Sequence, residues 1–336
     1  LLTPNDDGQY FPQKELAFDT KVVDQAISAL MIVDGSADNK TISLEDTLNF
    51  SVVYKNTGDT SYENPRVVAV INSNPEQILD WNNIEDAEFG KIKKTEDGRT
   101  ISWTSQQIPE LEELEPGEEG TINFSIPVKS FDELVNIDVA QLGKNAIKAY
   151  TSIRLTDDSG SDLPSIDGSP VTLSLNSNVR LDSKALYYFE DGTPIGTGPL
   201  PPVAGETTSY VVFWELSNDL HELRDITVTS SLPADVNWLD NSLVSAGEVT
   251  YDQGSKEITW LLNRLPLSAE DASLTFHIAL TPGEDNVGKL MKLLNNTIVT
   301  ATDTVTNDVI TITSGVLTTN LDDDEFAIGK GIVGLE

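Results

Sequence analysis

Apolar and polar residues alternate along many segments of this chain, each about as long as a β-strand. A period of two puts every second side chain on one face, as in strands that are buried on one side. Turn sequences such as NTGD, EDGR, EPGE, DQGS and TPGE separate these segments at the spacing of a sandwich or barrel. A helical turn or two is expected only in residues 131–143 and 283–294. The clearest strand patterns are LNFSVVYKN, RVVAVIN, TISWTS, TINFSIPV and AIKAYTSIRL, then SYVVFWELSN, DITVTSSL, EITWLLN, SLTFHIAL and TIVTATDTV.

The strand patterns occur in two copies. Trp81 and Trp238 are 157 residues apart in the sequence, and so are Trp103 and Trp260. The neighbouring residues match as well, NPEQILDWNN with LPADVNWLDN and GRTISW with SKEITW. Chance does not place four of five tryptophans in two pairs at one spacing, so the sequence predicts an internal duplication.

The offset between the copies drifts along the chain. An offset of 160 residues aligns LNFSVVY with TSYVVFW, and with them Tyr54 with Trp214. An offset of 152 residues aligns GTINFSIPV with ASLTFHIAL, and with them Phe124 with Phe276. Loops accept insertions and deletions more readily than strands do, so this drift is expected of two copies of one domain.

The duplication predicts an all-β protein made of two tandem immunoglobulin-like β-sandwich domains. We place module 1 at residues 12–158 and module 2 at residues 171–316. Residues 159–170 belong to the Asp-, Ser-, Gly- and Pro-rich stretch TDDSGSDLPSIDGSP and are predicted to be a linker. Residues 317–336 have no counterpart in the first copy, and we interpret them as a C-terminal tail, a linker to further domains or a docking strand.

The chain is strongly acidic, with 55 acidic and 21 basic side chains and a formal net charge of −34. Such a field repels polyanions, which argues against nucleic acid and anionic membrane surfaces as partners. A solvated, repulsive surface is the simplest interpretation, with calcium binding or a saline habitat as alternatives. The sequence has no cysteine, which excludes disulfides and zinc–thiolate sites, and no apolar run long enough to span a bilayer.

Particular motifs in both halves resemble a known family. VVYKNTGD and VVFWELSND, each followed by ISW or ITW, together with LEPGEEGTINFSI, resemble the DUF11-like conserved-repeat domains of bacterial and archaeal cell-surface proteins. The resemblance covers most of both modules. The second copy departs from it, since SND replaces NTG and LSAED replaces the PGE turn. The resemblance implies an immunoglobulin-like fold and a structural or adhesive role, and it supplies no catalytic residues.

Candidate catalytic chemistry is sparse. The chain has two histidines, His221 in a loop and His277 within a strand pattern, and neither lies near a nucleophile motif. We interpret both as satisfied or solvated side chains and predict that the protein is not an enzyme. Trp103 and Trp260 sit in alternating strands beside isoleucines, which favours core packing over a sugar-binding platform.

Calcium is the candidate ligand, although no cofactor is required by the pattern. Carboxylates and carbonyl oxygens are the groups that calcium prefers. Asp157, Asp158 and Asp162 could supply them at the predicted linker, where an ion would stiffen the joint between modules. Residues 322–325 are a second acidic cluster. Neither cluster has the spacing of an EF-hand loop, so a plain acidic surface remains the alternative.

The terminal segments suggest assembly. The sequence EFAIGKGIVGLE carries Phe326, Ile328, Ile332 and Val333, which is more apolar than a solvated tail requires. An unpaired sandwich edge can accept a strand from a neighbour through main-chain hydrogen bonds. We therefore predict that these residues dock on an adjacent subunit or module, with a linker to further domains as the alternative.

These observations predict a non-enzymatic structural unit of an extracellular surface protein, in a stalk, filament or surface layer. We expect its partners to be copies of itself or neighbouring modules of the same protein. The alternative is an adhesin fragment whose loops bind a protein or glycan on another cell. Because the chain begins at Leu1 without a signal-peptide pattern, we expect it to be a piece of a longer precursor.

Overall fold

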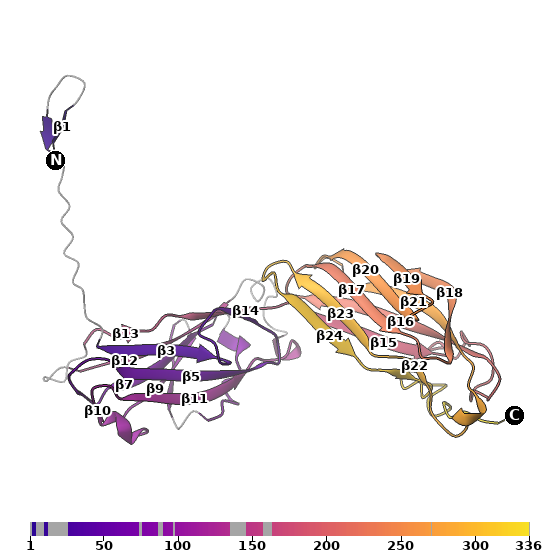
Figure 1. Ribbon diagram of the computed structural model, residues 1–336, viewed down its shortest axis with the longest axis horizontal. Coiled ribbons are helices and arrows are strands. Elements are labelled where there is room, and N and C mark those ends of the chain that lie inside the picture. The colour runs from indigo at the N-terminus through magenta and orange to yellow at the C-terminus, as the bar shows by residue number, and fades with distance from the viewer. Residues whose placement is uncertain are drawn as a thin grey trace.

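The computed structural model describes residues 2–4, 10–12, 26–73, 76–86, 90–96, 98–134, 146–156, 163–269 and 271–335. Within these ranges the chain forms β-strands and four single 3₁₀ turns, which confirms the all-β prediction. The turns are η1 (Glu76–Ile78), η2 (Pro109–Leu111), η3 (Asp132–Leu134) and η4 (Glu284–Asn286). The last two fall where the sequence suggested short helical segments. Two sandwich modules lie one after the other (Figure 1).

Module 1 has two facing sheets. One has the strand order β11-β5-β3, and the other has the order β4-β14-β12-β7-β9-β8, with β13 paired on β12 and a small separate pair of β10 with β6. The strands are β3 (Ile27–Val33), β4 (Lys40–Ile42), β5 (Thr47–Asn56), β6 (Tyr62–Glu63), β7 (Arg66–Asn72), β8 (Lys91–Lys94), β9 (Gly98–Trp103), β10 (Glu113–Leu114), β11 (Glu119–Pro127), β12 (Ala146–Arg154), β13 (Ile166–Asp167) and β14 (Val171–Leu175).

Module 2 repeats this plan. Its sheets have the orders β15-β16-β21-β18 and β19-β20-β17-β23-β24, with a short pair of β22 and β25. The strands are β15 (Asn178–Leu186), β16 (Thr208–Asp219), β17 (Leu223–Ser231), β18 (Val236–Val244), β19 (Glu248–Asp252), β20 (Glu257–Leu265), β21 (Ala272–Leu280), β22 (Lys292–Leu294), β23 (Thr297–Asp303), β24 (Val309–Ser314) and β25 (Leu317–Thr318).

Eight strands of module 1 correspond to eight strands of module 2, as expected of an internal duplication. The β3-β5-β11 order corresponds to β15-β16-β21, and β14-β12-β7-β9-β8 corresponds to β24-β23-β17-β20-β19. Trp103 pairs with Val67 in the first copy, and Trp260 pairs with Val228 in the second. Both tryptophans are fully buried, which confirms that they belong to the core.

The boundary between the modules differs from the prediction. The strand β14, which begins at Val171, pairs with β12 and with β4 and therefore belongs to module 1. Only residues 176–177 separate its end from the start of β15. Residues 159–170, predicted as the linker, instead lie between β12 and β14 of module 1. They include the short strand β13, which pairs with β12. A polar, glycine-rich sequence is as suitable for the turns between paired strands as for a spacer.

The two ends of the chain also differ from the predicted boundaries. Residue 12, the predicted start of module 1, belongs to β2 (Tyr10–Pro12), which pairs with β1 (Leu2–Pro4) in a separate two-stranded sheet. The first sandwich strand begins at Ile27. Residues 317–335 are part of module 2, because Leu321 and Ala327 join its buried cluster and Leu317 pairs with Leu294.

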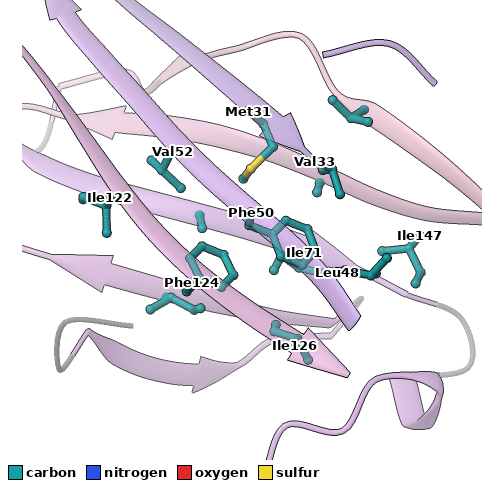
Figure 2. Close-up of a cluster of buried hydrophobic side chains, with 14 of the residues drawn as sticks. Met31, Val33, Leu48, Phe50, Val52, Ile71, Ile122, Phe124, Ile126 and Ile147 are labelled. Carbon is teal, nitrogen blue, oxygen red and sulfur yellow. The ribbon is translucent and has the colours of Figure 1, made fainter. Parts of the chain in front are cut away.

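Each module encloses its own apolar core. In module 1, Phe50 of β5 and Phe124 of β11 stack with ring centroids 4.9 Å apart, surrounded by aliphatic side chains of both sheets (Figure 2). In module 2 the rings of Trp214 and Phe276 meet edge-on at 5.2 Å. Aromatic pairs of this kind add to the burial of large apolar side chains. These two cores make each module a folded unit.

The strand register departs from the sequence alignment by two residues. Phe124 pairs with Phe50, whereas Phe276 pairs with Val212. If Phe124 corresponds to Phe276, then Phe50 corresponds to Val212, and Tyr54 does not correspond to Trp214 as the sequence match indicates. A shift of two leaves every side chain on its original face, so the alternating pattern is the same in either register.

Candidate functional site at the joint between the modules

A very short connection holds the modules together. The backbone N–H of Asn176 donates to the carbonyl of Ile42 in module 1 at 2.8 Å. The backbone N–H of the next residue, Ser177, donates to Oδ2 of Asp303 in module 2, also at 2.8 Å. Both residues of the connection are buried. Consecutive residues are therefore bonded to opposite modules, which leaves little freedom for the backbone between them.

Leu220 inserts from module 2 into module 1. It lies in the hairpin loop between β16 and β17, is 3% exposed, and belongs to the hydrophobic cluster of module 1. Its φ of +79° lies in the left-handed region, which costs a non-glycine residue about 1–2 kcal/mol. Burial of a leucine side chain contributes about 1.5–3 kcal/mol, which offsets this strain. The sequence placed this loop between strands, and an apolar residue at its tip was the only available signal.

Asp303 organises the module 2 side of the joint. Its carboxylate is fully buried and accepts hydrogen bonds from Nδ1 of His221 at 2.7 Å and from the backbone N–H of Ser177. Two further backbone donors, Val305 and Thr306, bond its other oxygen at 2.7 and 3.0 Å. Four donors around one buried carboxylate fix the positions of three separate segments of the chain.

These contacts determine the ionisation of Asp303. Burial by itself raises the pKa of this carboxyl, but the hydrogen bonds from His221 and from backbone N–H groups outweigh it and hold the pKa below its ordinary value of 3.8. A carboxyl with a lowered pKa stabilises the folded state at pH values above the unfolded pKa, and this contribution is lost as the pH falls through the folded pKa. The contribution of Asp303 to the joint is therefore present at neutral pH and is lost in acid.

Asp308 bridges the modules directly. Its Oδ2 accepts hydrogen bonds from the hydroxyl of Thr41 in module 1 at 2.6 Å and from the side-chain amide of Asn176 at 2.7 Å. The bond from Thr41 is the main reason why the pKa of Asp308 lies below its ordinary value. The hydroxyl of Thr306 donates to the other end of the Asn176 amide. The carboxylate is thus ionised at neutral pH and ties the two modules together.

A second contact flanks the joint. The Arg180 guanidinium of module 2 lies 5.7 Å from the centre of the Phe131 ring of module 1, within the range of a cation–π interaction. These side chains line a cavity of about 590 Å³ with Leu44, Glu45, Ser130, Asp132, Asn178 and Val179. Residues of both modules form its walls, so a change in the angle between the modules would change its shape.

The joint contains a serine, a histidine and an aspartate, but they are not arranged for nucleophilic catalysis. The Ser177 hydroxyl donates to the main-chain carbonyls of Asp219 and His221, and not to an imidazole nitrogen. A catalytic serine needs its hydroxyl hydrogen-bonded to the imidazole that accepts its proton. The hydrogen-bonded, buried His221 confirms the interpretation of a satisfied histidine, and His277 lies on β21 opposite Val211, away from the joint.

The predicted calcium ligands Asp157, Asp158 and Asp162 lie outside the described residues, so calcium binding there stays a prediction. The described residue before them, Thr156, follows the end of β12 that is remote from the joint, because Ala146 at the other end pairs with Ser174. An ion beside Thr156 would not stiffen the joint. Among the described residues, no cluster of three or more acidic or histidine side chains is placed to hold a metal ion.

The second acidic cluster has a structural explanation. Asp324 is 2% exposed, and its Oδ2 accepts the backbone N–H groups of Tyr187 and Tyr188 at 2.8 and 2.7 Å. Its Oδ1 accepts those of Phe326 and Ala327. The carboxylate therefore fastens the C-terminal segment to the end of β15, and its oxygens are already committed to backbone donors.

The predicted docking residues do not behave alike. Phe326, Ile328 and Ile332 are 43%, 51% and 53% exposed, whereas Val333 is 1% exposed. The backbone of Val333 bonds to that of Gly288 and Lys289, which places its side chain in the body of module 2. Val333 is therefore a core residue, and the other three are exposed side chains of the C-terminal segment. The C-terminus lies at the end of module 2 remote from module 1 (Figure 1).

Comparisons with known proteins give no family. No family model matches the chain, and no curated protein matches it. The C-terminal domain of the Streptococcus agalactiae antigen I/II polypeptide BspA is similar at 13% identity over 87% of this chain and 100% of that domain, with a TM-score of 0.32. The corresponding domain of Streptococcus pyogenes AspA gives 13% identity over 88% and 99%, with a TM-score of 0.33.

A shorter similarity extends to a pilus protein. Three N-terminal domains of the type V pili tip protein Mfa5 from Porphyromonas gingivalis match 31% of this chain and 22% of that chain at 15% identity, with a TM-score of 0.25. TM-scores this low carry no argument about what the present chain does. In the described part of the chain, no helix has the length and apolar character needed to cross a membrane.

Proposed function

We propose that this chain is a load-bearing pair of modules in an extracellular surface protein, where it acts as a stiff spacer within a stalk, filament or surface layer. The observation that carries the proposal is the joint: Leu220 of module 2 is buried in the core of module 1, and Asp308 bonds both sides. A flexible tether needs neither contact. The resemblance to DUF11-like repeats supports a location at the cell surface.

A stiff spacer requires that neither module moves without breaking specific contacts. Rotation about residues 176–177 would withdraw Leu220 from its apolar surroundings and would break the Asp308 bonds to Thr41 and Asn176. Each of these events exposes apolar surface or leaves a buried polar group unpaired, at a cost of about 1–3 kcal/mol apiece. Together they hold the modules in one arrangement.

Replacing Leu220 with aspartate is expected to release the joint and leave both modules folded, because the charged side chain would stay in water. The sequence contains no cysteine, so single cysteines at the exposed positions Lys93 and Glu257 can carry a spin-label pair without background. Pulsed electron–electron double resonance measures the distance between the two spin labels. It should give a narrow distance distribution for the parent chain and one at least twice as broad for Leu220→Asp.

The matched control is Leu261→Asp, which introduces the same charge at a leucine of module 2 that is 46% exposed and remote from the joint. This variant should keep the narrow distribution. Thermal melting of each variant establishes that the modules stay folded. A parent distribution as broad as that of Leu220→Asp would exclude a stiff spacer and would leave only a flexible tether.

The proposal extends to the C-terminal segment of module 2, where Phe326, Ile328 and Ile332 are exposed, and to Leu290, which is 49% exposed. We propose that these side chains act together as an apolar surface. Leu290 and Ile332 also pair through a β-bridge, so this surface is held in place. The occupant we propose is the end of another sandwich module from a second copy of this chain, docked by an apolar contact as Leu220 docks on module 1.

Sedimentation velocity tests this contact. The parent chain should show a concentration-dependent increase in sedimentation coefficient, and the triple variant Phe326→Ser, Ile328→Ser, Ile332→Ser should sediment as a monomer at every concentration. A control triple variant of exposed apolar residues elsewhere, Leu239→Ser, Leu243→Ser and Val309→Ser, should associate like the parent. A strictly monomeric parent chain would contradict self-assembly through this surface.

A further inference from the structure

Module 2 has a pocket on the outer face of its β15-β16-β21 sheet. A protein that acted only as a spacer would not need this pocket. Its volume is about 410 Å³. The central side chain is Phe213 of β16, flanked in the sheet by Lys184 and Thr275. The lining residues come from three strands and one loop: Asp182, Lys184, Leu186, Phe189, Glu190, Asp191, Phe213, Trp214, Glu215, Ser273 and Thr275.

Two phenylalanines form the apolar part of the pocket. Phe189 and Phe213 lie with ring centroids 6.5 Å apart and planes inclined by 52°. Phe189 is 47% exposed, which is a large exposed fraction for an aromatic side chain. The remaining lining is mainly charged, with four carboxylates against the single ammonium group of Lys184. The pocket therefore combines aromatic faces with an excess of three negative charges.

The loop that carries Phe189 is held in shape before any ligand binds. The backbone N–H of Phe189 donates to the carbonyl of Thr193, and that of Gly192 donates to the carbonyl of Phe189. Asp191 accepts the backbone N–H of Thr193 at 2.8 Å, and this bond is the main reason why the pKa of Asp191 lies below its ordinary value. A pre-formed loop avoids the entropic cost of ordering on binding.

The same position in module 1 lacks these features. With Phe124 matched to Phe276, Phe213 takes the ladder position of Ser51, whose hydroxyl donates to the Asn123 side chain at 2.7 Å. The two copies of this face have therefore diverged. In module 1 a polar pair closes the face, and in module 2 the face opens around two aromatic rings. The divergence lies on the solvent side, where the packing of the module does not demand it.

We infer that this pocket binds a lysine side chain presented by a partner polypeptide. An ammonium group is attracted both to the faces of aromatic rings and to carboxylates, and its aliphatic stem packs on the rings. A bare metal ion does not fit, since the described carboxylates do not converge into a cluster able to hold one. Leu243, 75% exposed and paired with Thr275 at the rim, adds apolar surface that a polypeptide would cover and a free amine would not.

Isothermal titration calorimetry of the whole chain in physiological salt tests the inference, with acetyl-tetralysine-amide as the probe. We expect saturable binding at one site, and a loss of affinity of about tenfold in Phe213→Ser, which installs the residue of module 1 without changing the charge. Phe189→Ser, in the exposed loop, should give a comparable loss and does not depend on how the sheet tolerates the first change. Glu248→Gln, an exposed carboxylate on the other sheet, should bind the probe like the parent.

Four results would overturn the inference. If the parent shows no saturable binding, or if both phenylalanine variants bind as well as the parent, the probe responds only to the general negative charge of −34. Spermidine titrated in parallel distinguishes the source of the amine. Stronger, saturable binding of spermidine than of the peptide would assign the pocket to a free polyamine and not to a polypeptide, and saturation by a neutral disaccharide in place of either amine would assign it to a glycan.

Discussion

Asp303→Ala is expected to lower the free energy of unfolding of module 2 by about 3–5 kcal/mol, because one buried carboxylate there accepts hydrogen bonds from four donors. The change removes this acceptor from the buried His221 ring and the buried backbone N–H of Ser177. It also removes it from the part-buried backbone N–H groups of Val305 and Thr306. Donors left unpaired away from water cost more than the hydrogen bonds contributed when they were formed. The expected loss is a large part of the stability of an ordinary domain.

Urea unfolding followed by tryptophan fluorescence measures this effect. Asp303→Asn, which keeps the shape and one accepting oxygen, should lie between the parent and the alanine variant. Asp271→Ala, at an exposed position just before β21, removes the same group from water and should change the stability by less than about 0.5 kcal/mol. A loss of under about 1 kcal/mol in Asp303→Ala would mean that water replaces the carboxylate at no great cost, and the joint would not depend on it.

Asp324→Ala is expected to destabilise module 2 by about 2–4 kcal/mol, because one buried carboxylate accepts four backbone N–H groups there. Two of the donors, Tyr187 and Tyr188, directly follow β15, and the other two, Phe326 and Ala327, belong to the C-terminal segment. Loss of the carboxylate should therefore separate the segment from the sandwich before the sandwich itself unfolds.

Hydrogen exchange distinguishes this local opening from general destabilisation. The amides of Tyr187, Tyr188 and Ala327 should lose protection in Asp324→Ala by a larger factor than amides of β16. Asp323→Ala is the matched control, since the neighbouring side chain is exposed and should leave both stability and exchange unchanged. Equal loss of protection in the C-terminal segment and in β16 would contradict a separate fastening role for Asp324.

The C-terminal segment contributes both core residues and exposed apolar residues to module 2. Residues 317–335 include the buried Leu321, Ala327 and Val333, so deletion of the whole segment would damage module 2 as well as remove the exposed apolar surface. Substitution of Phe326, Ile328 and Ile332 alone separates the two effects. The sequence by itself does not indicate this distinction, because its pattern predicts one docking surface from all four apolar residues of the segment.

The sequence by itself determined the class of fold, the duplication and most of the core. Alternation with a period of two indicates which side chains of a strand point inward. Trp103, Trp260 and Phe124 are buried, as their positions in this alternation predict. This information is local, since each strand displays its own buried face whatever strand lies beside it. The same reasoning placed His221 correctly as a satisfied side chain and indicated no catalytic group.

The tertiary structure decided the partners of each strand and every contact between distant segments. It assigned β14 to module 1, shifted the ladder of β16 by two residues, and brought Leu220 and Asp308 against the other module. A register shift of two preserves the alternating pattern, so the sequence does not distinguish one register from the other. A loop between paired strands has the composition of a linker, so the sequence does not distinguish these two either. Which alternative forms depends on the packing of segments far apart in the chain, and that packing is a property of the folded molecule as a whole.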